Sequence, residues 1–109
     1  MHTIDKADEA QLLATIDRWI EREVARFVVE PRRADLPMAF RIKIVERPDG
    51  DFIGYPEIAL KDASGQPDWT SGRGATIEEA LADTVRYLLE TVEGKEPIHE
   101  SAIWWDPRF

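Results

Sequence analysis

The sequence contains no cysteine, and this absence excludes disulfide bonds, thiolate catalysis and cysteine-ligated zinc sites together. It also has no apolar run of about eighteen residues, the minimum for a membrane-spanning helix. The opening segment "MHTIDKADEA" lacks the basic and then apolar layout of a secretory signal. These absences together predict a cytoplasmic protein that does not contact membranes.

Groups that could carry catalysis are also scarce. The two histidines, His2 and His99, have no serine or acid at a spacing that indicates a catalytic triad. Glu78 and Glu79 are neighbours on an expected helix, where adjacent side chains point about 100° apart, so a helix cap explains them better than a carboxylate pair does. The stretch "SGRGAT" is too short for a phosphate loop and has no lysine after its second glycine. We therefore expect no enzymatic activity, no cofactor and no metal site.

What the chain does contain is typical of one folded acidic domain. Its 109 residues are 43% hydrophobic and 33% charged, which predicts a folded protein with a single core. The net charge of −8 is uneven: residues 1–50 hold nine basic and ten acidic side chains, and residues 51–109 hold five and twelve. An acidic surface repels nucleic acid and favours basic partners, although the same charge can serve solubility alone.

The first expected element is an amphipathic helix over residues 8–29. Its apolar residues recur every three or four positions, and Leu12 and Trp19 widen that stripe into a candidate oligomer interface. Pro31 disfavours a helical conformation at the residue before it and so ends the helix.

Strands are expected next. Apolar and polar residues alternate over residues 39–46, and the turn "RPDGD" leads into a second strand over residues 51–58, so the two form a hairpin. "KDASGQPD" is interpreted as a loop, and a short third strand is expected over residues 69–72. A helix then starts at Thr76, where Glu79 completes a capping box, and ends near Gly94.

These elements predict an α+β fold with an antiparallel sheet of three or four strands and one helix packed on it. The N-terminal amphipathic helix is an addition to that core. We expect a single domain over residues 1–109, with the helix at 8–29, the sheet and helix at 39–93 and an aromatic tail at 95–109. Within the tail, "SAIWW" is a candidate short strand.

The hairpin at residues 41–55 and the segment "GRGATIEEALADTVRYLLE" together resemble the HicB-like antitoxin family. The resemblance covers residues of about 40–92 and implies a small sheet carrying one helix. It also implies a small RNA-cleaving toxin as partner. The residues after Val92 carry few basic side chains, so no DNA-binding segment and no direct contact with nucleic acid are expected.

Two groups of residues are candidates for binding a partner. Helix residues that share an exposed face form an acidic row interrupted by Arg86: Glu79, Asp83, Glu90 and Glu93. The tail is rich in aromatic side chains, namely Trp104, Trp105 and Phe109. Tryptophans in a tail indicate either that it docks on the core or that it anchors a partner.

The sequence thus predicts a non-catalytic, antitoxin-like neutraliser that covers a basic protein partner with its acidic helix and aromatic tail. An alternative is a phage-type inhibitor that presents acids to a nucleic-acid-handling complex in place of phosphates. A further alternative is a homo-oligomeric structural module, with a homodimer as its simplest form.

Overall fold

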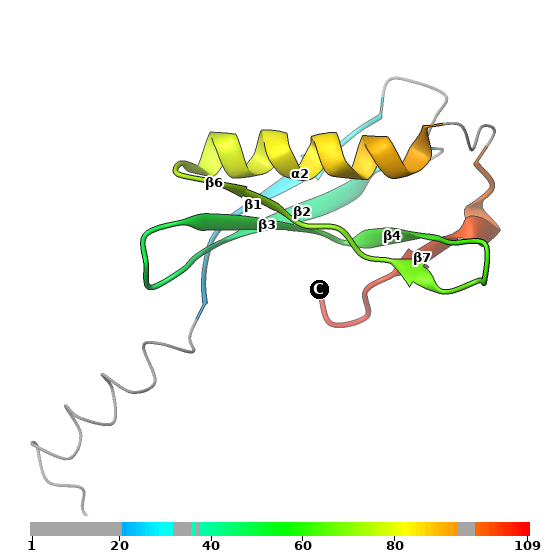
Figure 1. The fold of residues 1–109 in the computed structure, drawn as a ribbon, viewed down its shortest axis with the longest axis horizontal. Helices are drawn as coiled ribbons and strands as arrows, with labels where there is room; N and C mark the ends of the chain where they lie inside the picture. Colours follow the sequence, from blue (N-terminus) through cyan, green and yellow to red (C-terminus); the bar gives the residue numbers. More distant parts are fainter. Residues whose placement is uncertain (1–20, 32–35, 37, 94–97) are drawn as a thin grey trace, which may run out of the picture.

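The computed structural model describes residues 21–31, 36, 38–93 and 98–109. Within these ranges, four strands form one antiparallel sheet in the order β1-β2-β3-β6, and three form a second in the order β5-β4-β7. A helix, α2, lies on one side of the sheets (Figure 1). The expected α+β class is therefore confirmed. In chain order the elements are β1 (Arg22–Val29), β2 (Phe40–Glu46), β3 (Phe52–Pro56), β4 (Ile58–Lys61), β5 (Pro67–Asp68), β6 (Gly72–Gly74), α2 (Ile77–Val92), η1 (a 3-10 turn, Glu100–Ala102) and β7 (Ile103–Trp105).

The core lies between α2 and the sheets. Side chains alternate in direction along β2, so Ile42 and Ile44 face the helix and are fully buried. On α2, the buried residues recur every four positions: Ala80, Thr84, Leu88 and Val92. The sequence predicts a buried stripe through Ile77, Leu81, Val85, Leu88 and Val92. Leu88 and Val92 are buried as predicted, whereas the other three are only partly buried. The helix packs mainly on β6 and β3, and Ala80 and Thr84, which lie beside the predicted stripe, are fully buried.

The strand-to-helix turn forms as its sequence predicts. The Thr76 hydroxyl accepts a hydrogen bond from the Glu79 backbone at 3.1 Å and so caps α2. The Glu79 carboxylate reaches back and accepts from the Ala75 nitrogen at 2.9 Å. This reciprocal pair satisfies two backbone donors at the start of the helix.

The predicted helix over residues 8–29 is wrong for its second half. The described part forms β1, in which Ala25, Phe27 and Val29 are partly buried and the residues between them are exposed. The alternating pattern fits a strand, and Val24 and Val28 add to the β-branched content that favours one. Pairing with β2 supplies the backbone hydrogen bonds that a helix would have made internally. Residues 8–20 lie outside the described residues.

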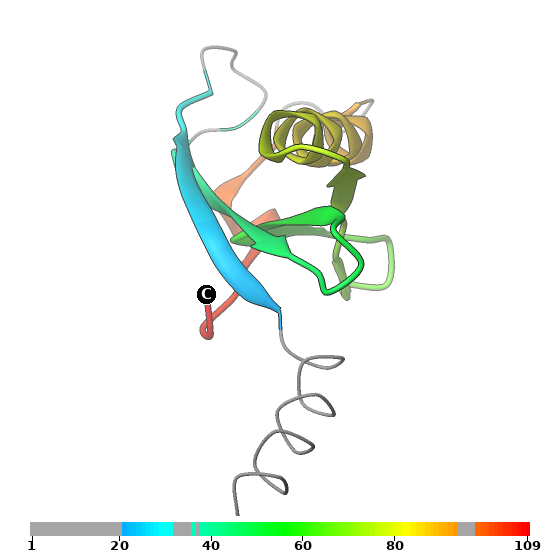
Figure 2. The same ribbon diagram turned by 90° about the vertical axis from the view of Figure 1, so that its left-hand side faces the viewer.

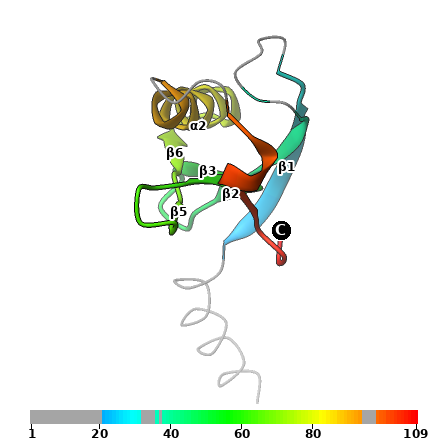
Figure 3. The same cartoon turned by 90° about the vertical axis from the view of Figure 1, so that its right-hand side faces the viewer.

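The expected loop "KDASGQPD" and the expected third strand both require correction. β4 runs into that stretch and β5 lies at its end, so the two form a small hairpin. The strand expected over residues 69–72 is instead β6, which begins at Gly72. The tail supplies β7, which pairs with β4 and confirms the strand expected in "SAIWW". Figure 1 labels the two strands side by side, and Figure 3 shows the tail in orange and red. The tail therefore docks on the core, and the second sheet depends on it.

Candidate functional site

A cleft of about 440 Å³ opens beside the face of the sheet that points away from α2. Residues from distant parts of the chain line it, coming from the β1, β2 and β3 region, the segment before β6 and the tail: Glu21, Glu23, Lys43, Val45, Tyr55, Pro56, Trp69, Thr70 and Asp106. Three of these side chains are carboxylates and only one is a cation. Two are large aromatics, so the lining combines negative charge with ring surface.

The alternation of the central strands explains why these side chains meet. Ile42 and Ile44 turn toward α2, so Lys43 and Val45 turn to the opposite face of β2. Tyr55 pairs with Lys43 across the β2–β3 ladder and therefore lies on that same face. The Lys43 ammonium stands 5.9 Å from the centre of the Tyr55 ring.

Two acids of the cleft lie at the start of β1 and are held by neighbouring groups. The Tyr55 hydroxyl donates to a Glu21 carboxylate oxygen at 3.2 Å, and burial, followed by the charge of Glu21, raises the pKa of Tyr55. Arg47 lies 3.7 Å from the same carboxylate. The hydrogen bond from Arg26 lowers the pKa of Glu23. Glu23 therefore keeps its negative charge to a lower pH than an ordinary glutamate does.

One polar atom in the cleft has no partner among the described residues. The Thr70 hydroxyl oxygen is buried and makes no hydrogen bond there. Burying a hydroxyl without a partner costs roughly 1–3 kcal/mol. Thr70 is adjacent to Trp69, a residue that is 47% exposed. A ligand group that enters the cleft can therefore meet the aromatic surface of Trp69.

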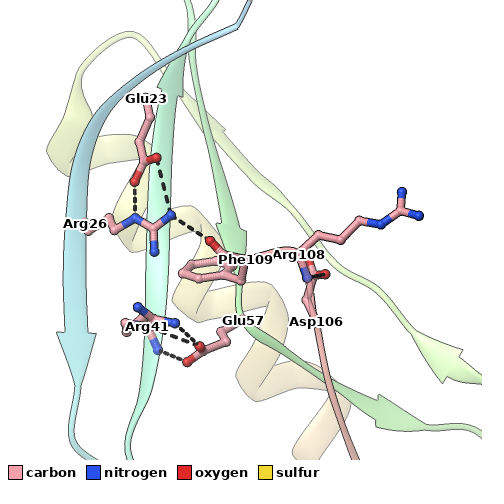
Figure 4. Close-up of polar contacts among 7 residues, drawn as sticks. All are labelled: Glu23, Arg26, Arg41, Glu57, Asp106, Arg108 and Phe109. Atoms are coloured by element: carbon pink, nitrogen blue, oxygen red, sulfur yellow. Dashed lines mark hydrogen bonds and ion pairs between the residues drawn. The ribbon is translucent and has the colours of Figure 1, made fainter.

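Beside the cleft, three cations lie near the Phe109 ring, and Figure 4 shows two of them, Arg26 and Arg41. Its ring centre lies 4.8 Å from the Arg26 guanidinium carbon, 5.2 Å from that of Arg41 and 5.2 Å from the Lys43 ammonium. Arg26 also donates to the Phe109 carbonyl oxygen at 2.7 Å. Such cation–π contacts contribute about 0.5–1 kcal/mol each at exposed sites. They fix the end of the tail on the face of β1 and β2 that carries the cleft.

The four acids expected to bind a partner differ in their surroundings. Glu79 caps the helix, and Asp83 accepts from the Arg73 backbone at 2.8 Å. The hydrogen bond from Arg86, followed by that from the Arg73 backbone, lowers the pKa of Asp83. These two acids therefore serve the protein's own fold. Glu90, 3.5 Å from Arg86, and Glu93, at the helix end, are exposed on α2.

The three expected tail residues also differ. Trp104 and Trp105 are 46% and 41% exposed, and the Lys61 ammonium stands 5.9 Å from the Trp104 ring. The end of the chain, marked C, lies below the sheets in Figure 1, whereas α2 lies above them, and the Phe109 ring contacts Arg26 there. The structure therefore does not bring the acidic row of α2 and Phe109 onto one surface. Leu12 and Trp19, the expected oligomer interface, lie outside the described residues.

Comparisons with protein-family models, with curated proteins and with solved structures yield no match to this chain. Across the described ranges, no helix is both long and apolar enough to cross a membrane. No group of three or more histidine, aspartate or glutamate side chains suited to a metal ion occurs in the part of the chain that the structure covers.

No local pattern in the sequence marks the cleft. Its residues come from five separate stretches, and only the fold of the tail and of the segment before β6 brings Asp106 and Trp69 to the same place. One signal was present in the sequence. Val45 and Ile53 are apolar residues on the side of the hairpin away from α2, which indicates that something covers part of that face.

Proposed function

We propose that the protein is a non-catalytic binding protein, and that it takes a basic side chain of a protein partner into the cleft bounded by Glu21, Glu23 and Asp106. The observation that carries this proposal is the composition of the cleft, which combines three carboxylates with two aromatic rings in one concave site. Concave sites with a few convergent polar groups are the usual places for specific binding.

An arginine side chain suits this lining best. Its guanidinium is planar, forms paired hydrogen bonds with carboxylates and stacks on aromatic faces. Trp69 and Tyr55 supply such faces. Lysine offers a compact charge and gains less from the rings.

The wider role that we propose is neutralisation of a basic partner by occlusion, in the cytoplasm. The resemblance to HicB-like antitoxins makes a small RNA-cleaving toxin the first partner to test. Glu90 and Glu93 on α2 and the half-exposed Trp104 and Trp105 provide further contact surface. Mimicry of nucleic acid by the acidic row of α2 has less support, because Glu79 and Asp83 already bind backbone groups of this chain.

The proposal is tested by titrating the full-length protein with a tetra-arginine peptide in a calorimeter at low ionic strength. Glu21→Gln and Asp106→Asn remove charge while keeping an acceptor for the Tyr55 hydroxyl and the Arg108 backbone, respectively. We expect each to weaken binding by roughly threefold, the size of an exposed ion pair. Trp69→Ala should weaken it further because the stacking surface is lost.

The matched control is Glu90→Gln, which removes one negative charge from α2 at a distance from the cleft and should leave peptide affinity unchanged. A tetra-lysine peptide should bind more weakly than tetra-arginine. Equal losses from Glu90→Gln and Asp106→Asn would mean that the peptide responds only to net charge. That result, or an affinity for tetra-arginine that Trp69→Ala leaves unchanged, would overturn the cleft as the binding site.

A further inference from the structure

The outer edge of β1 is unpaired by any other described strand. β1 ends the order β1-β2-β3-β6, and Figure 2 shows it at the edge opposite β6, over which α2 stands. Val28 is 66% exposed, the highest value among the large hydrophobic residues that are exposed in the described ranges. Phe27 and Val29 are only partly buried, since α2 packs mainly on β6 and β3.

The backbone of Val28 points outward at this edge. The Arg41 nitrogen donates to a Glu57 carboxylate oxygen at 3.2 Å, and the Arg41 carbonyl accepts from the Glu57 nitrogen at 2.8 Å. Both polar groups of Arg41 are thus used on the side away from β1. Val28 and Arg41 lie opposite each other and therefore form a non-hydrogen-bonded pair of the antiparallel ladder. In such a pair the N–H and C=O of Val28 point away from β2, toward the open edge. The same alternation turns those of Arg26 and Glu30 outward.

Proteins usually protect such an edge with lysine, proline or a bulge. In β1 these protective features lie only near the ends of the strand. A β-bulge or irregularity shifts the register between Glu23 and Ala25, and Pro31 follows the strand. The stretch between them, residues 25–30, pairs regularly with β2 over 25–29 and contains neither lysine nor proline. An exposed regular edge of this kind is a template for an added strand.

We propose that this edge pairs with the same edge of a second copy of the chain, antiparallel and centred on Val28. In this register Val28 lies opposite Val28 of the other copy. Arg26 of each copy lies opposite Glu30 of the other copy. Phe27 lies opposite Val29. The charges are therefore complementary without any further partner, as a twofold interface requires.

The register also avoids both obstacles at the ends of the strand. It uses residues 25–31 only, so the irregular pairing at Val24 stays outside it. Pro31 lies opposite Ala25 of the second copy. At this position the backbone nitrogen points toward β2 and not toward the second copy, so no hydrogen bond between the copies is lost because proline has no N–H. Arg26 already binds Glu23 and the Phe109 carbonyl, but a guanidinium has five donors and can serve Glu30 as well.

This pairing joins the two four-stranded sheets into one continuous sheet and leaves both α2 helices on the same side. The cleft stays accessible on the other side in both copies. The inference does not rest on the proposed binding of a basic partner, because it uses the edge of β1 and not the cleft. If the arginine peptide does not bind, the proposed pairing of the β1 edges is unaffected. If the chain does not form this dimer, the proposed binding in the cleft is unaffected.

The sharpest test uses the absence of native cysteine. Val28→Cys gives the chain a single thiol, and Cα atoms directly opposite in a hydrogen-bonded antiparallel pair are about 5.5 Å apart, within disulfide range. Mild oxidation of the full chain should therefore yield a covalent dimer. The matched control is Val24→Cys, also exposed, whose copies lie roughly 27 Å apart in this register and should not cross-link.

A second test is reversible and uses sedimentation equilibrium. The unmodified chain should show a concentration-dependent dimer. Val28→Pro removes an N–H that β2 does not use, so the fold should survive while the dimer dissociation constant rises by roughly tenfold or more. Glu30→Arg should also weaken the dimer, and adding Arg26→Glu should restore it.

The outcomes are decisive in either direction. Efficient cross-linking through Val28→Cys but not Val24→Cys, together with a weakened Val28→Pro dimer, supports the proposal. A chain that stays monomeric at all concentrations overturns it. So does a dimer that tolerates both Val28→Pro and Glu30→Arg, because its interface then lies elsewhere.

Discussion

Thr84 on α2 lies against the backbone of Gly72 on β6. A β-carbon added to Gly72 would stand 2.1 Å from the Thr84 nitrogen, and one added to Gly54 on β3 would stand 2.0 Å from the Thr84 hydroxyl oxygen. Real β-carbons do not approach other heavy atoms so closely. The glycines of "GRG" therefore permit close packing of the helix on the sheet.

The first prediction follows from this contact. Gly72→Ala should lower the free energy of unfolding by at least about 2 kcal/mol, because the clash is with helix backbone that cannot rotate away. Gly54→Ala should cost a similar amount but be partly rescued by Thr84→Ala, which removes the clashing oxygen. Urea denaturation measures both, with Ser71→Ala at an exposed neighbouring position as the control. A stable Gly72→Ala variant would contradict the close packing.

The second prediction separates structural acids from surface acids on α2. Thr76→Ala should lower the free energy of unfolding by about 1 kcal/mol because it removes the helix cap. Glu79→Ala should also destabilise the protein, since the Ala75 nitrogen loses its acceptor. Glu90→Ala, on the exposed side of the same helix, should change thermal stability little. Equal effects of Glu79→Ala and Glu90→Ala would show that the capping interaction adds nothing.

The third prediction concerns pH. Arg41 donates to the Glu57 carboxylate at 2.5 and 3.0 Å, and this interaction lowers the pKa of Glu57 below its ordinary value of 4.5. A lowered folded-state pKa adds stability above the unfolded pKa, and that stability is lost as pH falls through the folded pKa. Glu57→Gln should therefore cost about 1 kcal/mol near neutral pH.

The same difference between the parent chain and Glu57→Gln should shrink below pH 4.5 and disappear once Glu57 is protonated in the folded protein. Denaturant titrations over a pH series measure it. Glu90→Gln, which removes an exposed carboxylate of α2, serves as the control for the loss of one surface negative charge. A Glu57→Gln difference that is constant across the acid range would exclude the ion pair as its source.

The fourth prediction concerns the end of the tail. Phe109→Leu keeps most of the apolar volume but removes the ring that faces three cations, so it should cost about 0.5–1 kcal/mol. Hydrogen exchange at the Asp106 amide, which donates to the Glu57 carbonyl at 2.8 Å, should become faster. Arg108→Ala, at an exposed neighbouring residue, should leave that exchange rate unchanged. If both variants behave alike, the ring does not hold the tail.

Several elements could be predicted from the sequence because their signals are local. The hairpin of β2 and β3 follows from alternating residues on either side of a Pro-Asp-Gly turn. The start of α2 follows from Thr76 and Glu79, whose interactions span only a few residues. In both cases the hydrogen bonds that decide the structure join residues close together in the chain.

The residues of β1 were ambiguous because their apolar positions fit two periods. Val24 and Phe27 continue the helical spacing of the preceding segment, whereas Ala25, Phe27 and Val29 alternate as in a strand. Only the presence of β2 as a partner decides between the two, because it supplies backbone hydrogen bonds across ten or more intervening residues.

The sequence by itself determined the fold class, the central hairpin and the capped helix of this protein. The tertiary structure alone decided that residues 22–29 form a strand, that the tail completes a second sheet, and that Trp69 and Asp106 meet beside Lys43. The reason is physical: local periodicity and capping depend on neighbours a few residues away, whereas strand pairing and the shape of a cleft depend on contacts between segments that the sequence keeps far apart.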